Sequence, residues 1–367
     1  MPNDLIYKMA VTRIPKVGGV TAKNLISYCG GAEAVFRAKK RELLKIPGIG
    51  PVIADNILTQ TVLHEAEAEL EWIEQHDIQP IFYLDDTYPD RMRLYEDAPL
   101  MLYYKGNADL NAARIVSIVG TRKPTERGKA ICTEIVAGLK DYDVLIVSGL
   151  AYGIDVTAHR KCLEIGVPTV GILGHGLDQI YPAAHRQVGL DMCENGGLLT
   201  EFSYKAGPNR EHFPMRNRII AGMSDALIVV ESGAGGGSII SAKLGNKYNK
   251  SVFAVPGRLR DDQSKGCNGL IKRNKAHLLE SVEDVAYIME WIEEGVPKPA
   301  VQKQLFIDLS ENEQRIVNIL KTADEVTIDT ITFEAKMYPA QVSSLLLNLE
   351  FKGLVKSLPG KRYMLTY

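Results

Sequence analysis

Residues 115–122 read Ile-Val-Ser-Ile-Val-Gly-Thr-Arg, a largely apolar run that stops at a glycine and is followed by an arginine. An amphipathic, helix-like pattern comes next at about 125–139, and a second apolar run lies at 144–147. Short apolar runs that alternate with amphipathic stretches are typical of a mostly parallel sheet covered by helices. The stretch therefore predicts an α/β fold.

The alternation continues on both sides of this stretch. A helical pattern at 154–163 follows the second apolar run, and lead-in strands or extended segments are expected at 81–84 and 100–104. The remaining strands are expected at 168–173, 198–201, 226–230 and 252–255. We place this α/β domain at residues 78–295.

Residues 1–77 have helical patterns and two glycine-containing turns. The segment 46–51 (Ile-Pro-Gly-Ile-Gly-Pro) opens a helical stretch, and a weaker copy lies at 14–20. Both resemble the helix-hairpin-helix motif, in which N–H groups at a helix start can bind a DNA phosphate. We expect a helix-hairpin-helix (SAM-like) domain. A tight turn without a ligand is the alternative, and the 9 basic and 10 acidic residues of this segment favour it.

A proline-containing segment near residue 297 predicts a linker at 296–304, and a further domain follows it at 305–367. That domain shows three helical stretches and a turn at Gly360, the pattern of a winged helix. Its third helix, at about 340–351, contains no lysine or arginine. Because phosphate contacts dominate affinity for nucleic acid, we expect this domain to contact protein or to bind duplex DNA weakly.

The overall charge is balanced, with 43 Lys and Arg against 45 Asp and Glu in 367 residues, a net charge of −2. This total argues against a protein that coats nucleic acid through a generally basic surface. A local basic crevice is still compatible with it if arginines distant in sequence meet in the fold. The length predicts two or three domains.

No membrane span is expected, because no run of ~18 apolar residues occurs. The N-terminus does not read as a signal peptide, so we expect a cytoplasmic protein. The cysteines are odd in number, scattered and never spaced as CxxC, which disfavours both a disulfide framework and a zinc site. They are Cys29, Cys132, Cys162, Cys193 and Cys267.

Loops rich in Gly, Ser and Arg follow five of the predicted strands. In a parallel sheet these loops share one edge, where glycines allow a phosphate to approach and arginines bind it with two hydrogen bonds. Phe213 can stack on a base. These features predict a polyphosphate or nucleic-acid backbone as ligand. The candidate residues are Gly120, Thr121, Arg122, Ser148, Gly149, Arg210, Phe213, Arg216, Arg218, Gly236, Gly237 and Ser238.

Structural roles are the alternative for several polar residues near this edge. Arg216 and Arg218 can instead bond strand-end carbonyls, Asp155 can cap a helix, and His159 can be a buried packing residue. The sequence lacks GxxxxGK[ST], HExxH and GxSxG, and has no GxGxxG after the first core strand. We therefore expect no catalytic residue, no metal and no cofactor.

The central domain resembles the DprA/Smf family of DNA-processing proteins. The most specific match is Phe213-Pro-Met-Arg-Asn-Arg218, and others lie at 88–89, 97–100, 118–122, 148–155, 176–182, 255–257 and 266–271. The resemblance implies an extended Rossmann-like core flanked by helix-hairpin-helix and winged-helix domains. It also implies a homodimer formed through the core. The implied function is noncatalytic: binding and protecting incoming single-stranded DNA, and loading RecA recombinase onto it during natural transformation.

The resemblance assigns roles to individual positions. Arg122 resembles the arginine that binds the DNA backbone, Arg210 lies where relatives place a basic residue, and Gly237-Ser238 resembles an anion-binding turn. Two departures affect the phosphate contacts. Ala183 stands where relatives often have a basic residue, so that Arg186 is the nearest one, and Gly236-Gly237-Ser238-Ile239 replaces the usual Ser-Gly-Ser-Leu.

Two other functions compete with this one. The core more distantly resembles nucleotide phosphoribohydrolases, but Ser241 stands where that chemistry needs a glutamate. The chain can also be an adaptor, in which the end domains bind DNA and the core only dimerises.

Overall fold

The computed structural model describes residues 2–291, 309–321, 323, 325–358 and 360–365. The chain divides into two compact units, Met1–Glu293 and Glu294–Tyr367. The expected linker at 296–304 lies outside the described residues. The first unit contains both the N-terminal helices and the α/β core, so the boundary expected between residues 77 and 78 stays a prediction.

The core of the first unit is a nine-stranded sheet in the order β1-β2-β6-β5-β4-β3-β7-β8-β9. β1 and β2 pair antiparallel, β2 pairs antiparallel with β6, and all other neighbours are parallel. The strands are β1 (Gln79–Phe82), β2 (Met101–Gly106), β3 (Ile115–Val119), β4 (Leu145–Ser148), β5 (Thr169–Ile172), β6 (Gly196–Thr200), β7 (Ala226–Val229), β8 (Ser251–Ala254) and β9 (His277–Leu278). The predicted α/β fold with a mostly parallel sheet is confirmed.

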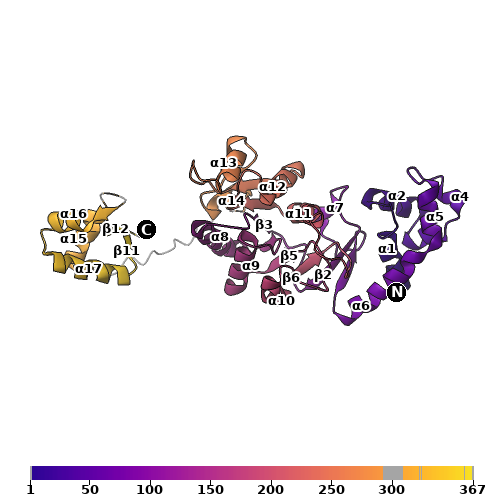
Figure 1. Cartoon of the computed structure of the whole chain (residues 1–367), viewed down its shortest axis with the longest axis horizontal. Helices are drawn as coiled ribbons and strands as arrows, with labels where there is room; N and C mark the ends of the chain where they lie inside the picture. The colour runs from indigo at the N-terminus through magenta and orange to yellow at the C-terminus, as the bar shows by residue number, and fades with distance from the viewer. Residues whose placement is uncertain (1, 292–308, 322, 324, 359, 366–367) are drawn as a thin grey trace. The chain divides into compact units, whose positions relative to one another are not determined.

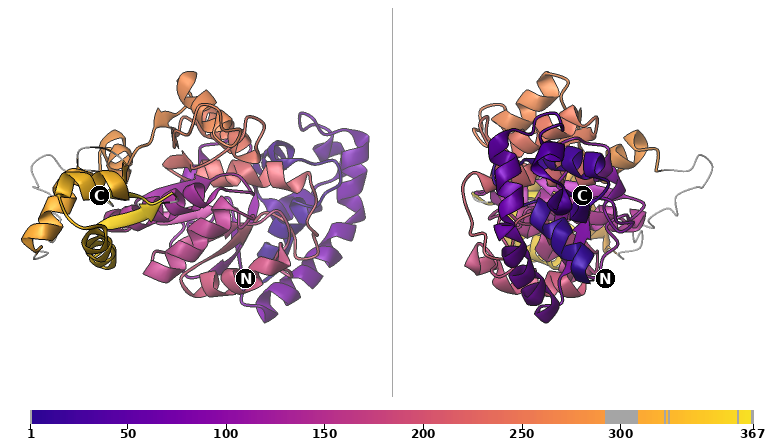
Figure 2. Two further views of the ribbon diagram at one scale, coloured as in Figure 1. Left: turned by 60° about the vertical axis from the view of Figure 1, so that its left-hand side comes forward. Right: turned by 90° about the vertical axis from the view of Figure 1, so that its right-hand side faces the viewer.

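Helices cover both faces of the sheet, which explains why its strands are apolar on both sides. Ile115 and Val119 of β3 belong to the cluster that packs on α11 and α12, whereas Val116 and Ile118 pack on α8 and α9. Figure 1 shows α12 and α13 on one side of the sheet and α9 and α10 on the other, and the views of Figure 2 show the same layers. The helices are α7 (Asp90–Arg93), α8 (Glu126–Leu139), α9 (Ile154–Ile165), α10 (Arg186–Glu194), α11 (His212–Met223), α12 (Gly237–Lys247), α13 (Lys265–Lys272) and α14 (Val282–Ile288), with short 3-10 helices η1 (Lys140–Tyr142) and η2 (Ala183–His185).

Six helices precede the sheet within the described residues: α1 (Pro2–Val11), α2 (Gly19–Cys29), α3 (Ala32–Arg37), α4 (Lys40–Leu43), α5 (Pro51–Thr59) and α6 (Thr61–Gln75). Gly18 before α2 and Gly50 before α5 have matching backbone angles, φ −87° and ψ 174° against φ −91° and ψ 174°. The two glycine turns are therefore copies of one structure. Their apolar cluster continues into the core at Leu100, Met101 and Tyr103.

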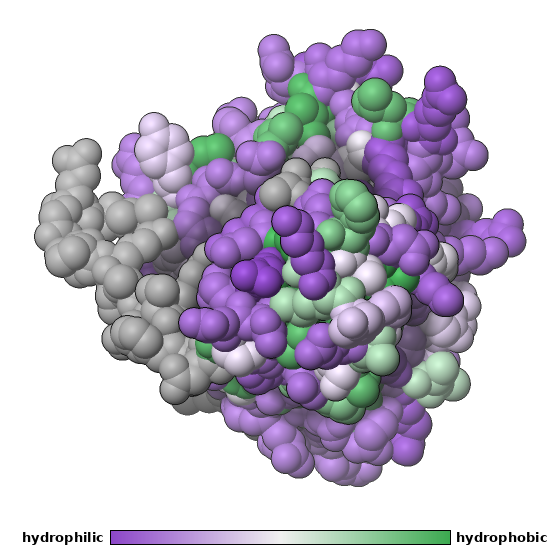
Figure 3. Space-filling model, turned by 90° about the vertical axis from the view of Figure 1, so that its left-hand side faces the viewer, coloured by the Kyte–Doolittle hydropathy of each residue, from purple (hydrophilic) through white to green (hydrophobic). Residues whose placement is uncertain are grey.

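The described residues of the C-terminal unit form three helices, α15 (Glu311–Leu320), α16 (Ile328–Ala335) and α17 (Pro339–Phe351), and a small sheet in the order β10-β12-β11. The strands are β10 (Val326–Thr327), β11 (Val355–Leu358) and β12 (Arg362–Leu365). This is the predicted winged helix. Hydrophobic residues interrupt the hydrophilic surface drawn in Figure 3, and in this unit Phe333, Tyr338 and Phe351 are each more than 80% exposed.

Candidate nucleic-acid interface

The loops after the parallel strands meet at one edge of the sheet, as the sequence predicts. The Thr121 N–H, after β3, donates to the Glu231 carbonyl, after β7, at 2.7 Å. Arg216 of α11 donates through Nη1 to the carbonyl of Gly149, after β4, and to that of Ile172 at the end of β5, both at 2.6 Å. Loops that are far apart in the sequence therefore form one surface.

The exposed part of this surface centres on the half-buried ring of Phe213. The guanidinium of Arg122 lies 5.7 Å from the centre of this ring, that of Arg216 lies 5.9 Å away, and the Tyr181 ring is at 6.2 Å. Arg122 is exposed and has no hydrogen bond or ion pair within residues 2–291. An aromatic ring beside an unpaired guanidinium suits a nucleic-acid strand, because the ring can stack on a base while the arginine binds a phosphate.

Arg216 has a different environment, since only 4% of the residue is exposed. Besides its two carbonyl partners it interacts with the buried carboxyl of Asp155. Burial lowers the pKa of Arg216 to about 10, and Asp155 opposes that shift. Burial also raises the pKa of Asp155, and the charge of Arg216 opposes this shift. Arg216 therefore joins two strand ends, which is the structural role that the sequence left open for it.

Arg218 belongs to another side of α11. Its guanidinium forms an ion pair with Glu201, and the two side chains are 15% and 10% exposed. Burial raises the pKa of Glu201, and the nearby Arg218 opposes this shift. Within the described part of the chain, Arg218 has no cation–π contact with Phe213, and neither residue is hydrogen-bonded to it. The structure thus separates Arg218 from Arg122, although both are candidates in the sequence.

The small residues of the predicted site mostly serve packing. A Cβ on Gly149 would lie 2.0 Å from Nη1 of Arg216, and one on Gly120 would lie 2.4 Å from Cγ1 of Ile154. Ser148 is buried and donates to the Ile118 carbonyl at 2.5 Å, and buried Ser238 donates to the Ser232 hydroxyl at 2.8 Å. The two serines help to fix the strand ends, and their hydroxyls are already hydrogen-bonded within the chain.

Four candidates are exposed or half-buried and have no cation–π contact or hydrogen bond with Phe213 in the described residues. Gly236 precedes α12 and Gly237 begins it, with no side-chain cap. Arg186 begins α10 and Arg210 precedes α11, and both are exposed. A role for them in binding DNA stays a prediction.

The buried His159 is placed for packing. Its Nδ1 lies 2.7 Å from the Thr169 hydroxyl, and none of the residue is exposed. Burial, together with the charges of His185 and Arg216, lowers its pKa to about 3. The ring is therefore neutral near pH 7, and its complete burial keeps it away from a DNA strand at the surface.

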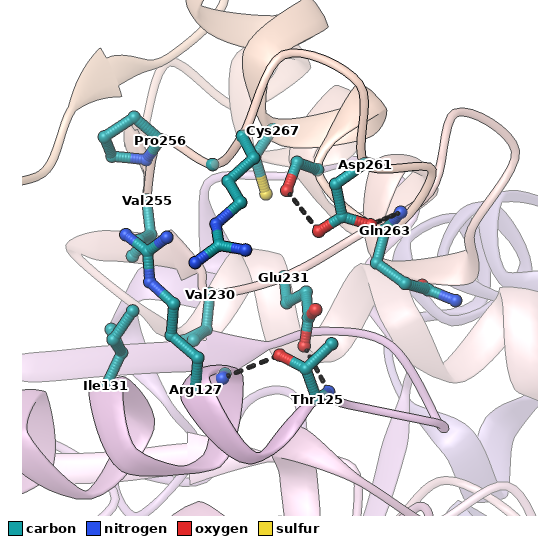
Figure 4. Close-up of a pocket in the computed structure, with 14 residues that line it drawn as sticks. Thr125, Arg127, Ile131, Val230, Glu231, Val255, Pro256, Asp261, Gln263 and Cys267 are labelled. Atoms are coloured by element: carbon teal, nitrogen blue, oxygen red, sulfur yellow. Dashed lines mark hydrogen bonds between the residues drawn. The ribbon is translucent and has the colours of Figure 1, made fainter. Parts of the chain in front are cut away.

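Glu231 is a site residue that the sequence reasoning missed. Its carboxylate accepts the N–H of Thr125 at 2.9 Å, directly before α8, and it lines a pocket of about 190 Å³ with Arg127 and Arg258 (Figure 4). The carboxylate thus takes the place at the helix start that a phosphate takes in many nucleotide-binding folds. Its position two residues after β7, at the edge that the other loops share, is the signal that could have found it.

Two searches of the described residues bear on other functions. No group of three or more His, Cys, Asp or Glu residues has the arrangement of a metal site. No described helix combines the length and the apolar character that crossing a membrane requires.

Three family models match the chain. The model for DNA recombination-mediator protein A matches residues 79–290, that for the DprA winged helix domain matches residues 299–361, and that for the helix-hairpin-helix motif matches residues 10–65. The chain is 31% identical to Protein Smf of Synechocystis over 391 residues, which cover 97% of this chain and 98% of the relative. It is 39% identical to DNA processing protein DprA of Streptococcus pneumoniae over 202 residues, 55% of this chain and 71% of the relative.

Two solved structures are similar as well. DNA processing protein A of Streptococcus pneumoniae superposes with a TM-score of 0.68 at 30% identity, covering 77% of this chain and 97% of that one. DNA processing protein A of Helicobacter pylori superposes with a TM-score of 0.53 at 28% identity, covering 58% of this chain and 95% of that one. The second structure is described as one that explains a single-stranded DNA binding mode.

Proposed function

Because this chain belongs to the DprA/Smf family of DNA recombination mediators, we propose that it binds single-stranded DNA at the edge formed by Arg122 and Phe213. The observation that carries the proposal is the exposed, unpaired guanidinium of Arg122 beside the Phe213 ring. A base can stack on that ring while its phosphate binds the arginine. The relative from Helicobacter pylori, which binds single-stranded DNA, supports the same ligand class.

The proposal extends to what the bound strand is for. We propose that it protects incoming single strands in the cytoplasm and loads RecA recombinase onto them during natural transformation, acting as a homodimer formed through the core and without catalytic turnover, as the resemblance to the DprA/Smf family implies. The balanced charge agrees with a narrow binding site, because a net charge of −2 gives little attraction for duplex DNA in general.

A salt titration of the full chain with fluorescent oligo-dT and with duplex DNA tests the proposed ligand. We expect tighter binding of the single strand, and affinity that falls as salt rises because phosphate contacts release counterions. Arg122→Ala is expected to weaken single-strand binding by about 1–3 kcal/mol, the range for a charge-assisted contact. Arg273→Ala removes an exposed arginine after α13 and serves as the matched control.

Equal affinity of Arg122→Ala and the unaltered chain would remove Arg122 from the site. Equal affinity for single and double strands would contradict the proposed ligand class. The RecA step is tested separately, by measuring RecA assembly on single strands with the unaltered chain and with Arg122→Ala. A chain that binds the strand but leaves RecA assembly unchanged would contradict the loading function alone.

A further inference from the structure

The loop that carries Arg122 is bound at both of its ends by one residue. This Arg122 loop, residues 120–125, joins β3 to α8. At its start the Thr121 N–H donates to the main-chain carbonyl of Glu231 at 2.7 Å. At its end the Thr125 N–H donates to the carboxylate of Glu231 at 2.9 Å. The exposed residues Arg122 and Lys123 lie between these two bonds.

Glu231 is well placed to fix the loop, because it is itself fixed. Only 7% of the residue is exposed, and it directly follows Val230, whose N–H donates to the Val119 carbonyl at 3.1 Å. A Cβ on Gly128 would lie 2.1 Å from Oε2 of Glu231, so the first turn of α8 packs directly against the carboxylate. In Figure 4 the carboxylate points to the start of this helix, beside Thr125.

Other hydrogen bonds hold the Thr121 end of the loop more firmly than the Thr125 end. Thr121 accepts the Ile154 N–H through its carbonyl at 3.2 Å and the Lys123 N–H through its hydroxyl at 3.2 Å. The Thr125 hydroxyl accepts the Gly128 N–H and so begins α8. The side chain of Arg122 contacts the Phe213 ring, and its backbone packs against Gly153, where a Cβ would lie 2.8 Å from the Arg122 Cα. The Thr125 end therefore relies on the Glu231 carboxylate to stay in register with β7.

We propose that Glu231 is a positioning residue for single-stranded DNA binding, which presents Arg122 to the strand by binding both ends of its loop. The inference rests on the proposed function, because it assigns Glu231 a role in that same site. A side chain whose position is fixed in advance loses less conformational entropy when it binds its ligand. The carboxylate touches no DNA and acts only through the loop.

Removing the carboxylate tests this role. We expect Glu231→Ala to lower the affinity for oligo-dT about tenfold, comparable to the loss of one charge-assisted phosphate contact. The slope of log affinity against log salt should become shallower by about one, because Arg122 no longer neutralises its phosphate reliably. In an Arg122→Ala background the same substitution should add almost nothing, since the two residues act in series.

Two milder variants separate geometry from charge and keep the test valid if Glu231→Ala does not fold. Glu231→Gln retains an oxygen that can accept the Thr125 N–H, so most of the affinity should remain. Glu231→Asp keeps the charge but is one methylene shorter, so affinity should fall. Asp284→Ala is the matched control, because Asp284 is also a carboxylate that accepts N–H groups before a helix, at Glu280 and Ser281, in a different part of the fold.

Amide hydrogen exchange tests the same contact without DNA. Exchange at Thr125 should be faster in Glu231→Ala than in the unaltered chain, while exchange in β4 stays the same. Unchanged exchange at Thr125, or equal effects of Glu231→Ala in the presence and absence of Arg122, would overturn the positioning role. An unaltered chain that fails to bind oligo-dT would instead overturn the proposed function.

Discussion

Arg122 and Arg216 approach the same ring from two different environments. Their guanidinium groups lie 5.7 and 5.9 Å from the centre of the Phe213 ring. Arg122 is exposed, whereas Arg216 is 4% exposed and bonded to two strand-end carbonyls. An exposed guanidinium can exchange water for a phosphate, but a buried one would first have to break bonds that the fold needs. The site thus has a rim at the surface (Arg122, Tyr181 and Phe213) and a buried support (Arg216, Asp155 and His159).

The largest expected effect is on stability and comes from a substitution in the buried support. Arg216→Ala should lower the free energy of unfolding by about 3–5 kcal/mol, because it leaves the carboxyl of Asp155 and two carbonyls buried without their partner. Urea denaturation measures this loss, with Arg122→Ala as the control that should leave the midpoint unchanged. If both variants unfold at the same urea concentration, the division into rim and support does not hold.

The next effect belongs to the rim. Phe213→Ala should weaken oligo-dT binding by about 1–3 kcal/mol, the range for a lost base–aromatic stack, and should affect unfolding much less than Arg216→Ala. Phe213→Trp keeps an aromatic face and should retain most of the affinity. Anisotropy titrations at one salt concentration compare the three proteins. A tryptophan variant as weak as the alanine variant would argue against stacking.

The dependence of stability on pH tests the buried support through His159. Its pKa is about 3 in the folded chain against an ordinary value of 6.5, so below pH 6.5 the unfolded chain binds a proton that the folded chain does not. Stability is therefore lost as pH falls, by about 1.4 kcal/mol at pH 5.5 relative to neutral pH. Asp155 and Glu201, whose pKa values are raised, act in the opposite direction.

The variant His159→Gln isolates this contribution, because the other groups are common to both proteins. The difference in unfolding free energy between the unaltered chain and His159→Gln should change by that amount between neutral pH and pH 5.5. Denaturation curves at the two pH values measure it. A difference that does not depend on pH would mean that the ring is not held neutral by burial.

The smallest expected effect concerns Arg186, an exposed residue at the start of α10 that has no cation–π contact with Phe213 in the described residues. Arg186→Ala should weaken oligo-dT binding by less than about 1 kcal/mol, as for a peripheral phosphate contact screened by solvent. Its effect should disappear at high salt. A loss as large as that of Arg122→Ala would extend the rim to this helix.

Much of the fold follows from local patterns in the sequence. The expected strand at 115–119 is β3, and the third helix of the C-terminal domain, expected at about 340–351, is α17. Other elements differ by one or two residues at their ends, such as β6, which begins at Gly196 two residues before the expected Leu198. Glycine weakens a strand pattern because it adds no apolar side chain, so pairing with β5 decides that boundary. The two-residue β9 is too short to leave a pattern at all.

The location of the candidate site could be predicted from the sequence, but its individual contacts could not. Strand order brings the loops after β3, β4, β5 and β7 to one edge, and the sequence predicts this edge because βα units repeat along the chain. Arg122 and Phe213 lie together there as expected. The sequence does not single out Glu231, because a lone carboxylate after a strand belongs to no spaced motif. Its partner Thr125 lies 106 residues away in the chain.

By itself, the sequence determined the α/β fold, its flanking domains and the family, because these depend on periodicity and on contiguous motifs such as residues 213–218. Only the tertiary structure decided that neither arginine of that motif is available and that Arg122 is. Arg216 is buried where it binds two carbonyls that lie 67 and 44 residues away in the chain. Arg218 is paired with Glu201, which directly follows β6. Burial and partnership are properties of packing between distant segments, so residues that look alike in a motif can differ in the fold.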